Sequence, residues 1–162
     1  MNKTVKILLC AGLAVGLTAA AVAMIKGPTG EEQEKTPEFV TVKDGRFYIG
    51  DKEYRYIGTN FWYGAILASE GQGGNRERLA KELDFMQEIG INNVRVLVGG
   101  DGDASHIFEI RPTLQTAPGV YNDTLLCGLD YLMATLERRN MKAVLYLNNS
   151  WEWSGGFGVY RH

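Results

Sequence analysis

The segment INNVRVLVGG at residues 91–100 decides the fold of this chain. Val94, Val96 and Val98 recur with a period of two, which predicts a β-strand whose valine face packs against covering helices. Arg95 then points to the opposite face of the sheet. Because a guanidinium stays protonated and is costly to bury alone, an inward Arg95 needs a carboxylate, a polar ligand or water beside it. The alternative is an arginine on an edge strand that extends into solvent.

Glycines and aspartates follow this strand at residues 99–103 and predict a loop. In α/β proteins, the loops at the carboxyl ends of parallel strands hold the functional residues. A candidate site is therefore expected on the side of the sheet where the Arg95 strand ends.

Two segments precede the part of the chain that we expect to fold. Residues 1–25 combine early lysines with a long apolar run and an Ala-Val-Ala segment, which predicts a signal peptide or an uncleaved signal anchor. Residues 26–37 are polar and acidic and predict a flexible tether to a domain at residues 38–162. We expect a secreted, periplasmic or cell-surface protein that contacts the membrane only through its amino-terminal segment, and that stays anchored if the segment is not cleaved.

Charge and cysteine content narrow the partners and cofactors. The formal net charge of −2 argues against a nucleic-acid partner. Cys127 is the one cysteine outside residues 1–25, so we expect no internal disulfide and interpret Cys127 as a small apolar packing residue. His106 and His162 lie far apart in the sequence and have no partners at ligand spacing. We therefore expect no metal site and no cofactor.

The remaining chain alternates strands with helices. Residues 39–42 and 46–49 predict a hairpin through Asp44-Gly45, and residues 50–52 predict a second turn. Helices are predicted at residues 76–89, capped by Asn75, and from a cap at Asn122 or Asp123 to about Asn140, while residues 101–121 lack periodicity and predict a long loop. The apolar stripe of the first helix is Leu79, Leu83 and Met86, and that of the second is Leu125, Leu129, Leu132, Met133 and Leu136.

The order of these elements indicates an α/β protein. The strands at residues 54–59, 93–98 and 142–147 are separated by helices, so we expect them to be adjacent and parallel in that order. A hairpin followed by three βα units is typical of the amino-terminal part of a (β/α)8 TIM barrel, here truncated. A doubly wound sheet is the alternative, although no Gly-x-Gly-x-x-Gly loop follows the first strand.

Aromatic and amide side chains gather where these strands end. Asn60 and Trp62 follow the first strand, and Asn149 and Trp151 follow the third. Flat aromatic rings stack on sugar faces and amides hydrogen-bond hydroxyl groups. These four residues are therefore our candidates for binding a polysaccharide, although each aromatic alone is as well explained by core packing.

Four motifs within residues 39–160 resemble the amino-terminal part of glycoside hydrolase family 5, and in particular its β-1,4-mannanase branch. The motifs are GTNFWYG at residues 58–64, GINNVRV at 90–96, QTAPGVY at 115–121 and NNSWEWSGG at 148–156. The resemblance implies a TIM barrel that cleaves internal mannosidic bonds of mannan, glucomannan or galactomannan with retention. By the same resemblance, Arg95 matches the arginine that supports the catalytic nucleophile.

The resemblance also implies that the acid/base glutamate and the nucleophile follow the fourth and seventh barrel strands, which places both beyond residue 162. We interpret Glu70, Glu109 and Glu152 as loop residues and expect this chain to be an inactive fragment of a secreted endo-β-1,4-mannanase. The alternatives are a β-1,4-glucanase of the same family, a non-catalytic carbohydrate-binding relic, and a membrane-anchored structural protein whose aromatics are core residues.

Overall fold

A computed structural model describes residues 39–103, 110–148 and 150–160. Thr41–His162 forms a compact unit of its own, to which all the elements below belong. The predicted signal and the predicted tether both lie outside the described residues. Among the helices that the structure describes, none has the length and apolar character needed to cross a membrane.

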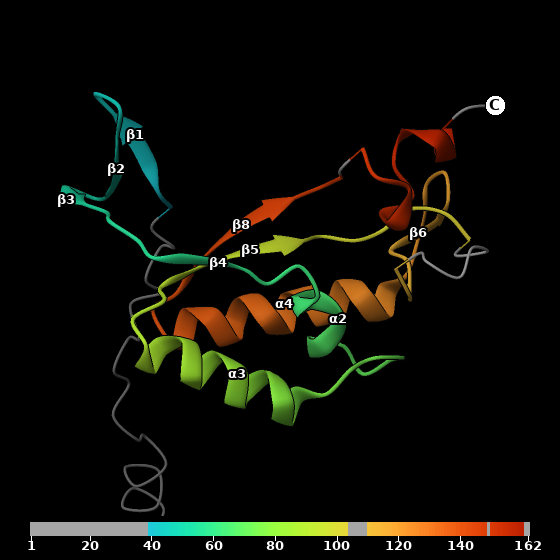
Figure 1. Cartoon of the computed structure of the whole chain (residues 1–162), viewed down its shortest axis with the longest axis horizontal. Coiled ribbons are helices and arrows are strands. Elements are labelled where there is room, and N and C mark those ends of the chain that lie inside the picture. Colours follow the sequence, from blue (N-terminus) through green and yellow to red (C-terminus); the bar gives the residue numbers. More distant parts are fainter. Residues whose placement is uncertain (1–38, 104–109, 149, 161–162) are drawn as a thin grey trace, which may run out of the picture. The chain divides into compact units, whose positions relative to one another are not determined.

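The folded unit begins with three short antiparallel strands, β1 (Thr41–Lys43), β2 (Arg46–Ile49) and β3 (Lys52–Glu53) (Figure 1). Asp44 and Gly45 form the first turn with φ values of 51° and 74°, as a two-residue hairpin loop requires. The predicted hairpin is therefore confirmed. The expectation that Lys52 belongs to a turn is wrong, because Lys52 pairs with Ile49 and starts β3.

Three parallel strands form the central sheet in the order β4 (Gly58–Asn60), β5 (Asn93–Leu97) and β8 (Lys142–Tyr146). This order and direction confirm the prediction from the helix-separated strands. The register pairs Asn60 with Arg95, and Arg95 with Val144. Figure 1 shows all three strands running toward the same edge of the sheet.

The first parallel strand is shorter than predicted, since β4 begins at Gly58 rather than at Tyr54. The side chain of Asn92 explains the difference. Its Oδ1 accepts a hydrogen bond from the Ile57 N–H at 3.0 Å, and its Nδ2 donates to the Arg55 carbonyl at 3.2 Å. The Arg55 carbonyl and the Ile57 N–H thus bond to a side chain, while the Ile57 carbonyl accepts from a backbone N–H of the adjoining segment, that of Asn92 at 3.1 Å.

Helices cover the valine face of the sheet (Figure 1). Asn75 caps α3 (Arg76–Glu88) by accepting from the Arg78 N–H, and Asn122 caps α4 (Asp123–Arg138) by accepting from the Thr124 and Leu125 N–H groups. Both helices confirm the prediction. A third helix, α2 (Gly64–Ala68), was not predicted, because five residues are too few to show a helical period.

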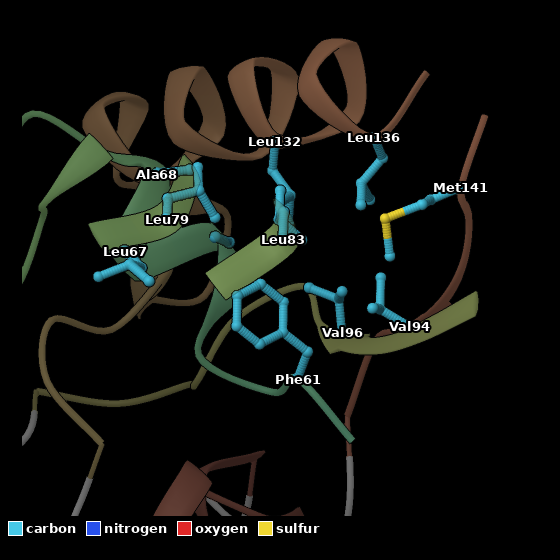
Figure 2. Packing of buried hydrophobic residues seen from close by; sticks show 11 residues of the cluster. Phe61, Leu67, Ala68, Leu79, Leu83, Val94, Val96, Leu132, Leu136 and Met141 are labelled. Carbon is cyan, nitrogen blue, oxygen red and sulfur yellow. The ribbon is translucent and has the colours of Figure 1, made fainter. Parts of the chain in front are cut away.

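The core lies between the sheet and the helices. Figure 2 shows the side chains of α3 and α4 pointing toward β5, and the largest buried members are Phe61, Leu67, Leu79, Leu83, Val94, Val96, Leu132, Leu136 and Met141. The buried valine face of β5 is therefore confirmed. Two expectations are wrong: Met133 and Cys127 are exposed, because both lie on the side of α4 away from the sheet and α2.

The segment predicted as a long loop contains a second small hairpin, β6 (Gln115–Ala117) and β7 (Val120–Tyr121). Residues 104–109 of this segment lie outside the described residues. After β8, the chain forms two 3-10 helices, η1 (Glu152–Ser154) and η2 (Phe157–Tyr160). These elements are two to four residues long, and contacts with distant segments hold them in place.

Candidate functional site

Arg95 lies in the middle strand of the parallel sheet, on the face opposite the helices. Its Nη1 donates a hydrogen bond to Asn60 Oδ1 at 3.3 Å, and its guanidinium carbon lies 3.5 Å from the centre of the Tyr146 ring. Neighbouring strands supply both partners. Asn60 lies in β4, where it pairs with Arg95 of β5, and Tyr146 lies in β8. The edge-strand alternative is therefore wrong, although the arginine side chain is exposed.

The contacts of Arg95 leave hydrogen-bonding capacity for a ligand. A guanidinium carries five N–H donors in a plane. Asn60 Oδ1 accepts from one of them, while the Tyr146 ring covers the face of the guanidinium rather than its edge. An arginine held in this way keeps donors for a carboxylate or a sugar hydroxyl. Asn60 was predicted as a candidate from the sequence, whereas Tyr146 was not, because its ring lies inside a strand rather than after it.

Trp62 lies just beyond the end of β4 and is partly buried among aromatic rings. Its ring meets the Trp153 ring edge-on, with centroids 5.2 Å apart, and meets the Tyr63 ring at 5.4 Å. Such edge-to-face contacts fix the orientation of an indole. Trp153 was not predicted as a site residue, although its place two residues after Trp151 was a usable signal.

Trp151 is the most accessible of these indoles, with 69% of the residue exposed. It precedes η1 on the segment that follows β8. Asn149, the fourth candidate for substrate binding, lies outside the described residues. The chain has three tryptophans, and all of them belong to the segments that follow β4 and β8. A role for Trp62 and Trp151 in binding sugar stays a prediction.

A hydrogen-bonded network connects the segment after β4 to α3. The Tyr63 hydroxyl donates to Glu82 Oε2 at 2.8 Å, and Arg78 Nε donates to Glu82 Oε1 at 2.6 Å. Burial, followed by the hydrogen bond to Glu82, raises the pKa of Tyr63 above its usual value. The carboxylate of Glu82 likewise raises the pKa of Arg78. The network holds the backbone next to Trp62 in place.

The acidic side chains considered as catalytic candidates have different surroundings. Glu70 is exposed and pairs with Arg76 at 2.6 Å, while Arg76 also lies over the Tyr131 ring. Glu152 is exposed at the start of η1, and Glu109 lies outside the described residues. Asp101, which was not predicted as a site residue, is nearly buried and accepts hydrogen bonds from Asn148 and Gln115. Within the described part of the chain, no three histidine, cysteine or acidic residues gather as a metal site would require.

Comparison with solved structures places this arrangement in a known fold. A glycoside hydrolase family 5 mannosidase from Rhizomucor miehei superposes with a TM-score of 0.72 and 40% sequence identity, over 76% of this chain and 30% of that chain. A glutamate-to-alanine variant of that mannosidase, in complex with mannosyl-fructose, gives a TM-score of 0.71 and 40% identity. The predicted fold class is confirmed: the chain is α/β and corresponds to a part of the family 5 barrel.

Curated relatives agree with the structural comparison. A putative mannan endo-1,4-β-mannosidase 9 from Oryza sativa is 30% identical over 149 residues, which are 92% of this chain and 34% of the relative. A putative mannan endo-1,4-β-mannosidase 4 from Arabidopsis thaliana is 26% identical over 140 residues. The chain thus spans about a third of the length of the relatives that it matches. Residues 37–162 match the model of the β-mannosidase-like group of glycoside hydrolase family 5, and this chain therefore belongs to that family.

Proposed function

We propose that this chain forms the amino-terminal part of the substrate cleft of a retaining endo-β-1,4-mannanase. One observation carries the proposal: Arg95, in the middle strand, contacts Asn60 and Tyr146 at the same edge of the sheet that carries the tryptophans. The names of the rice and Arabidopsis relatives, and the mannosyl-fructose bound by the fungal mannosidase variant, support mannan as the polysaccharide.

Arg95 has a defined task in such an enzyme. Retaining hydrolysis uses two carboxyl groups about 5 to 5.5 Å apart, one as the acid and one as the nucleophile. A guanidinium beside the nucleophile donates charge-assisted hydrogen bonds and favours the ionised carboxylate. The family resemblance puts both glutamates after later barrel strands, whereas the described residues supply three parallel strands. Arg95 would therefore support a nucleophile contributed from elsewhere in the barrel.

The aromatic side chains fit the substrate-binding part of the same task. The apolar face of a mannose ring can stack on the exposed Trp151 indole, and Trp62 offers a second ring whose orientation Trp153 fixes. Asn60 and Asn149 supply amides for hydroxyl groups. We assign these four residues to substrate binding and Arg95 to support of the nucleophile.

The chain alone is proposed to bind manno-oligosaccharides without cleaving them. Glu70 is engaged by Arg76, and both carboxylate oxygens of Asp101 accept hydrogen bonds from amides. Glu152 is an exposed carboxylate at the start of η1, next to Trp151, and is the residue to test.

Export is the proposed route to a polysaccharide substrate. The lysines and apolar run of residues 1–25 support a signal peptide, or a signal anchor if cleavage does not occur. Amino-terminal sequencing of the protein recovered from the medium or the cell surface distinguishes the two, because only cleavage removes the apolar run.

Binding and turnover of the purified chain test the proposed function together. Calorimetric titration should give binding of mannotetraose, and reducing-sugar assays should give no release from mannan. Stronger binding of cellotetraose than of mannotetraose would favour the β-1,4-glucanase alternative. Turnover of mannan that Glu152→Gln abolishes would show that the chain carries its own catalytic carboxylate and that the proposal is wrong on this point. If a longer protein that contains all eight barrel strands binds mannotetraose but does not cleave mannan, the alternative of a non-catalytic carbohydrate-binding relic would be favoured.

A further inference from the structure

Asp101 is a nearly buried carboxylate that the proposed mechanism does not use. It lies in the loop after β5, and 9% of the residue is exposed. Its Oδ2 accepts a hydrogen bond from Asn148 Nδ2 at 2.6 Å, and its Oδ1 accepts one from Gln115 Nε2 at 3.2 Å. Hydrogen bonds to an ionised acceptor are stronger than those between neutral groups. With both oxygens engaged in this way, Asp101 is suited to holding other segments together.

The side chain of Asp101 bonds to Asn148 at the start of the segment after β8, and its backbone bonds to a residue farther along the same segment. The Asp101 N–H donates to the Ser154 carbonyl at 3.0 Å. Asn148 precedes Trp151 by three residues, and Ser154 follows it by three. One residue therefore binds this segment on both sides of the exposed indole. Inside the segment, the Ser154 N–H donates to the Trp151 carbonyl at 3.2 Å, which closes the turn.

Further contacts fix Asp101 itself. Gln115 Oε1 accepts from the Gly119 N–H at 2.8 Å, so the Gln115 amide must present its Nε2 donor to Asp101. The Gly102 N–H donates to the Gln115 carbonyl at 2.8 Å. Gly155 has a φ of 93° and lies so close to the Asp101 carbonyl that a Cβ atom would clash with it. The carboxylate is thus anchored to the β6–β7 hairpin and aimed at the segment after β8.

We propose that Asp101 is a positioning residue, which fixes the segment carrying Trp151 against the loop after β5 and so sets the indole surface for sugar binding. The use of this surface for sugar rests on the proposed function. The positioning itself does not, since it concerns the chain without ligand.

Tryptophan fluorescence can test this proposal in the full chain, because all three tryptophans follow β4 or β8. Asp101→Ala leaves the amides of Asn148 and Gln115 without their acceptor, so we expect a shifted emission maximum and increased acrylamide quenching. The dissociation constant for mannotetraose should rise about tenfold. Asp101→Asn should restore most of the fluorescence behaviour and of the mannotetraose affinity, because it keeps an acceptor for Gln115 and can pair with a rotated Asn148 amide. Asp130→Asn, at an exposed position on α4, is the matched control and should change neither.

The ligand-free fluorescence separates this inference from the proposed function. Absence of mannotetraose binding by the unmodified chain would count against the proposed function alone. Unchanged emission and quenching in a folded Asp101→Ala chain would overturn the role of Asp101, whether or not the chain binds mannotetraose. Where Asp101→Ala does not fold, Asn148→Ala removes one bond and leaves the Gln115 contact. Increased quenching in that variant supports the proposal, and unchanged quenching contradicts it.

Discussion

At the scale of single residues, the site depends on side chains whose orientation other side chains fix. The Tyr146 ring and the Asn60 amide hold the guanidinium of Arg95, while Trp153 and Tyr63 hold the indole of Trp62. Most of the surface of Trp151 is exposed, whereas Trp62 is partly buried. The two candidate indoles should therefore respond differently to truncation.

Trp151→Ala should weaken mannotetraose binding about five- to tenfold, since truncation of an aromatic anchor removes its contact area. Its free energy of unfolding should change by less than about 0.5 kcal/mol, as is usual for an exposed position. Trp62→Ala should also weaken binding but cost about 1 to 3 kcal/mol of stability, because it removes the contacts with Trp153 and Tyr63. Calorimetry and urea denaturation measure the two effects. Unchanged affinity in both variants would remove these tryptophans from the sugar site.

Tyr63 should make the stability of the chain depend on alkaline pH. Burial and Glu82 raise the pKa of Tyr63 in the folded state, so its stabilising contribution is complete below the unfolded pKa near 10 and is lost as pH rises through the folded pKa. Tyr63→Phe should cost about 1 kcal/mol at pH 8 by removing the bond to Glu82, and this cost should shrink at pH 11. Tyr121→Phe, at an exposed position, is the control. A cost for Tyr63→Phe that is the same at both pH values would contradict the assignment.

At the scale of elements, helix capping connects the fold to the site. Asn75 and Asn122 each cap a helix, but Asn122 also donates through Nδ2 to the Thr113 carbonyl, which lies shortly before the β6–β7 hairpin. Asn122 therefore stabilises a helix start and an irregular segment together. Asn75 is exposed, and its side chain caps α3 alone.

Asn122→Ala should consequently destabilise the chain more than Asn75→Ala. The loss of a cap costs about 1 kcal/mol, which is the value expected for Asn75→Ala. Asn122→Ala should cost about 2 kcal/mol, since the bond to Thr113 is lost as well. Parallel urea denaturation of the two variants checks the difference. Equal costs would show that the Thr113 contact does not contribute.

Periodicity in the sequence predicted the elements that are long enough to have a period. β5, α3 and α4 contain five to sixteen residues, and their strand alternation or leucine stripes were visible. β8 was predicted from the short run at residues 142–147, which does not alternate. α2, β6 and β7 contain two to five residues and are held by tertiary contacts. The Cβ position of Gly128, for example, lies 2.6 Å from the Ala65 carbonyl, so α2 packs where α4 has no side chain.

The candidate site was predictable to the extent that its residues follow strand ends. Asn60, Trp62 and Trp151 were found by this rule, and Arg95 was found by its place opposite the valines. Tyr146 and Asp101 were missed, because their importance depends on which side chains from other strands and loops meet them. The register between strands and the closure of loops determine these side-chain contacts, and neither can be read from the local sequence.

At the scale of the whole molecule, the parallel sheet has apolar surface along its outer strand. β8 pairs with β5 on one side and is the last strand of the described sheet. Val144, in β8, is 50% exposed, and Leu147 just after β8 is more exposed still. An edge strand with apolar side chains is a template for pairing with another chain.

The chain should therefore associate as its concentration rises. Val144→Lys should reduce this association, because a lysine on an edge strand opposes edge-to-edge pairing. Val120→Lys makes the same change at an exposed position on β7 and should leave the association nearly unchanged. Sedimentation velocity over a range of concentrations measures both variants. A monomeric chain at all concentrations would refute the role assigned to the β8 edge.

The most direct test of a sugar site at the carboxyl ends of β4 and β8 is a nuclear magnetic resonance titration of the indole N–H signals. The chain has three tryptophans, so three indole signals are expected, and single Trp→Phe variants assign them. Mannotetraose should shift the Trp151 and Trp62 signals in a saturable way, with the Trp153 signal following because its ring contacts Trp62. Three unmoved indole signals at a concentration that saturates any binding would contradict the placement of the substrate cleft at this edge.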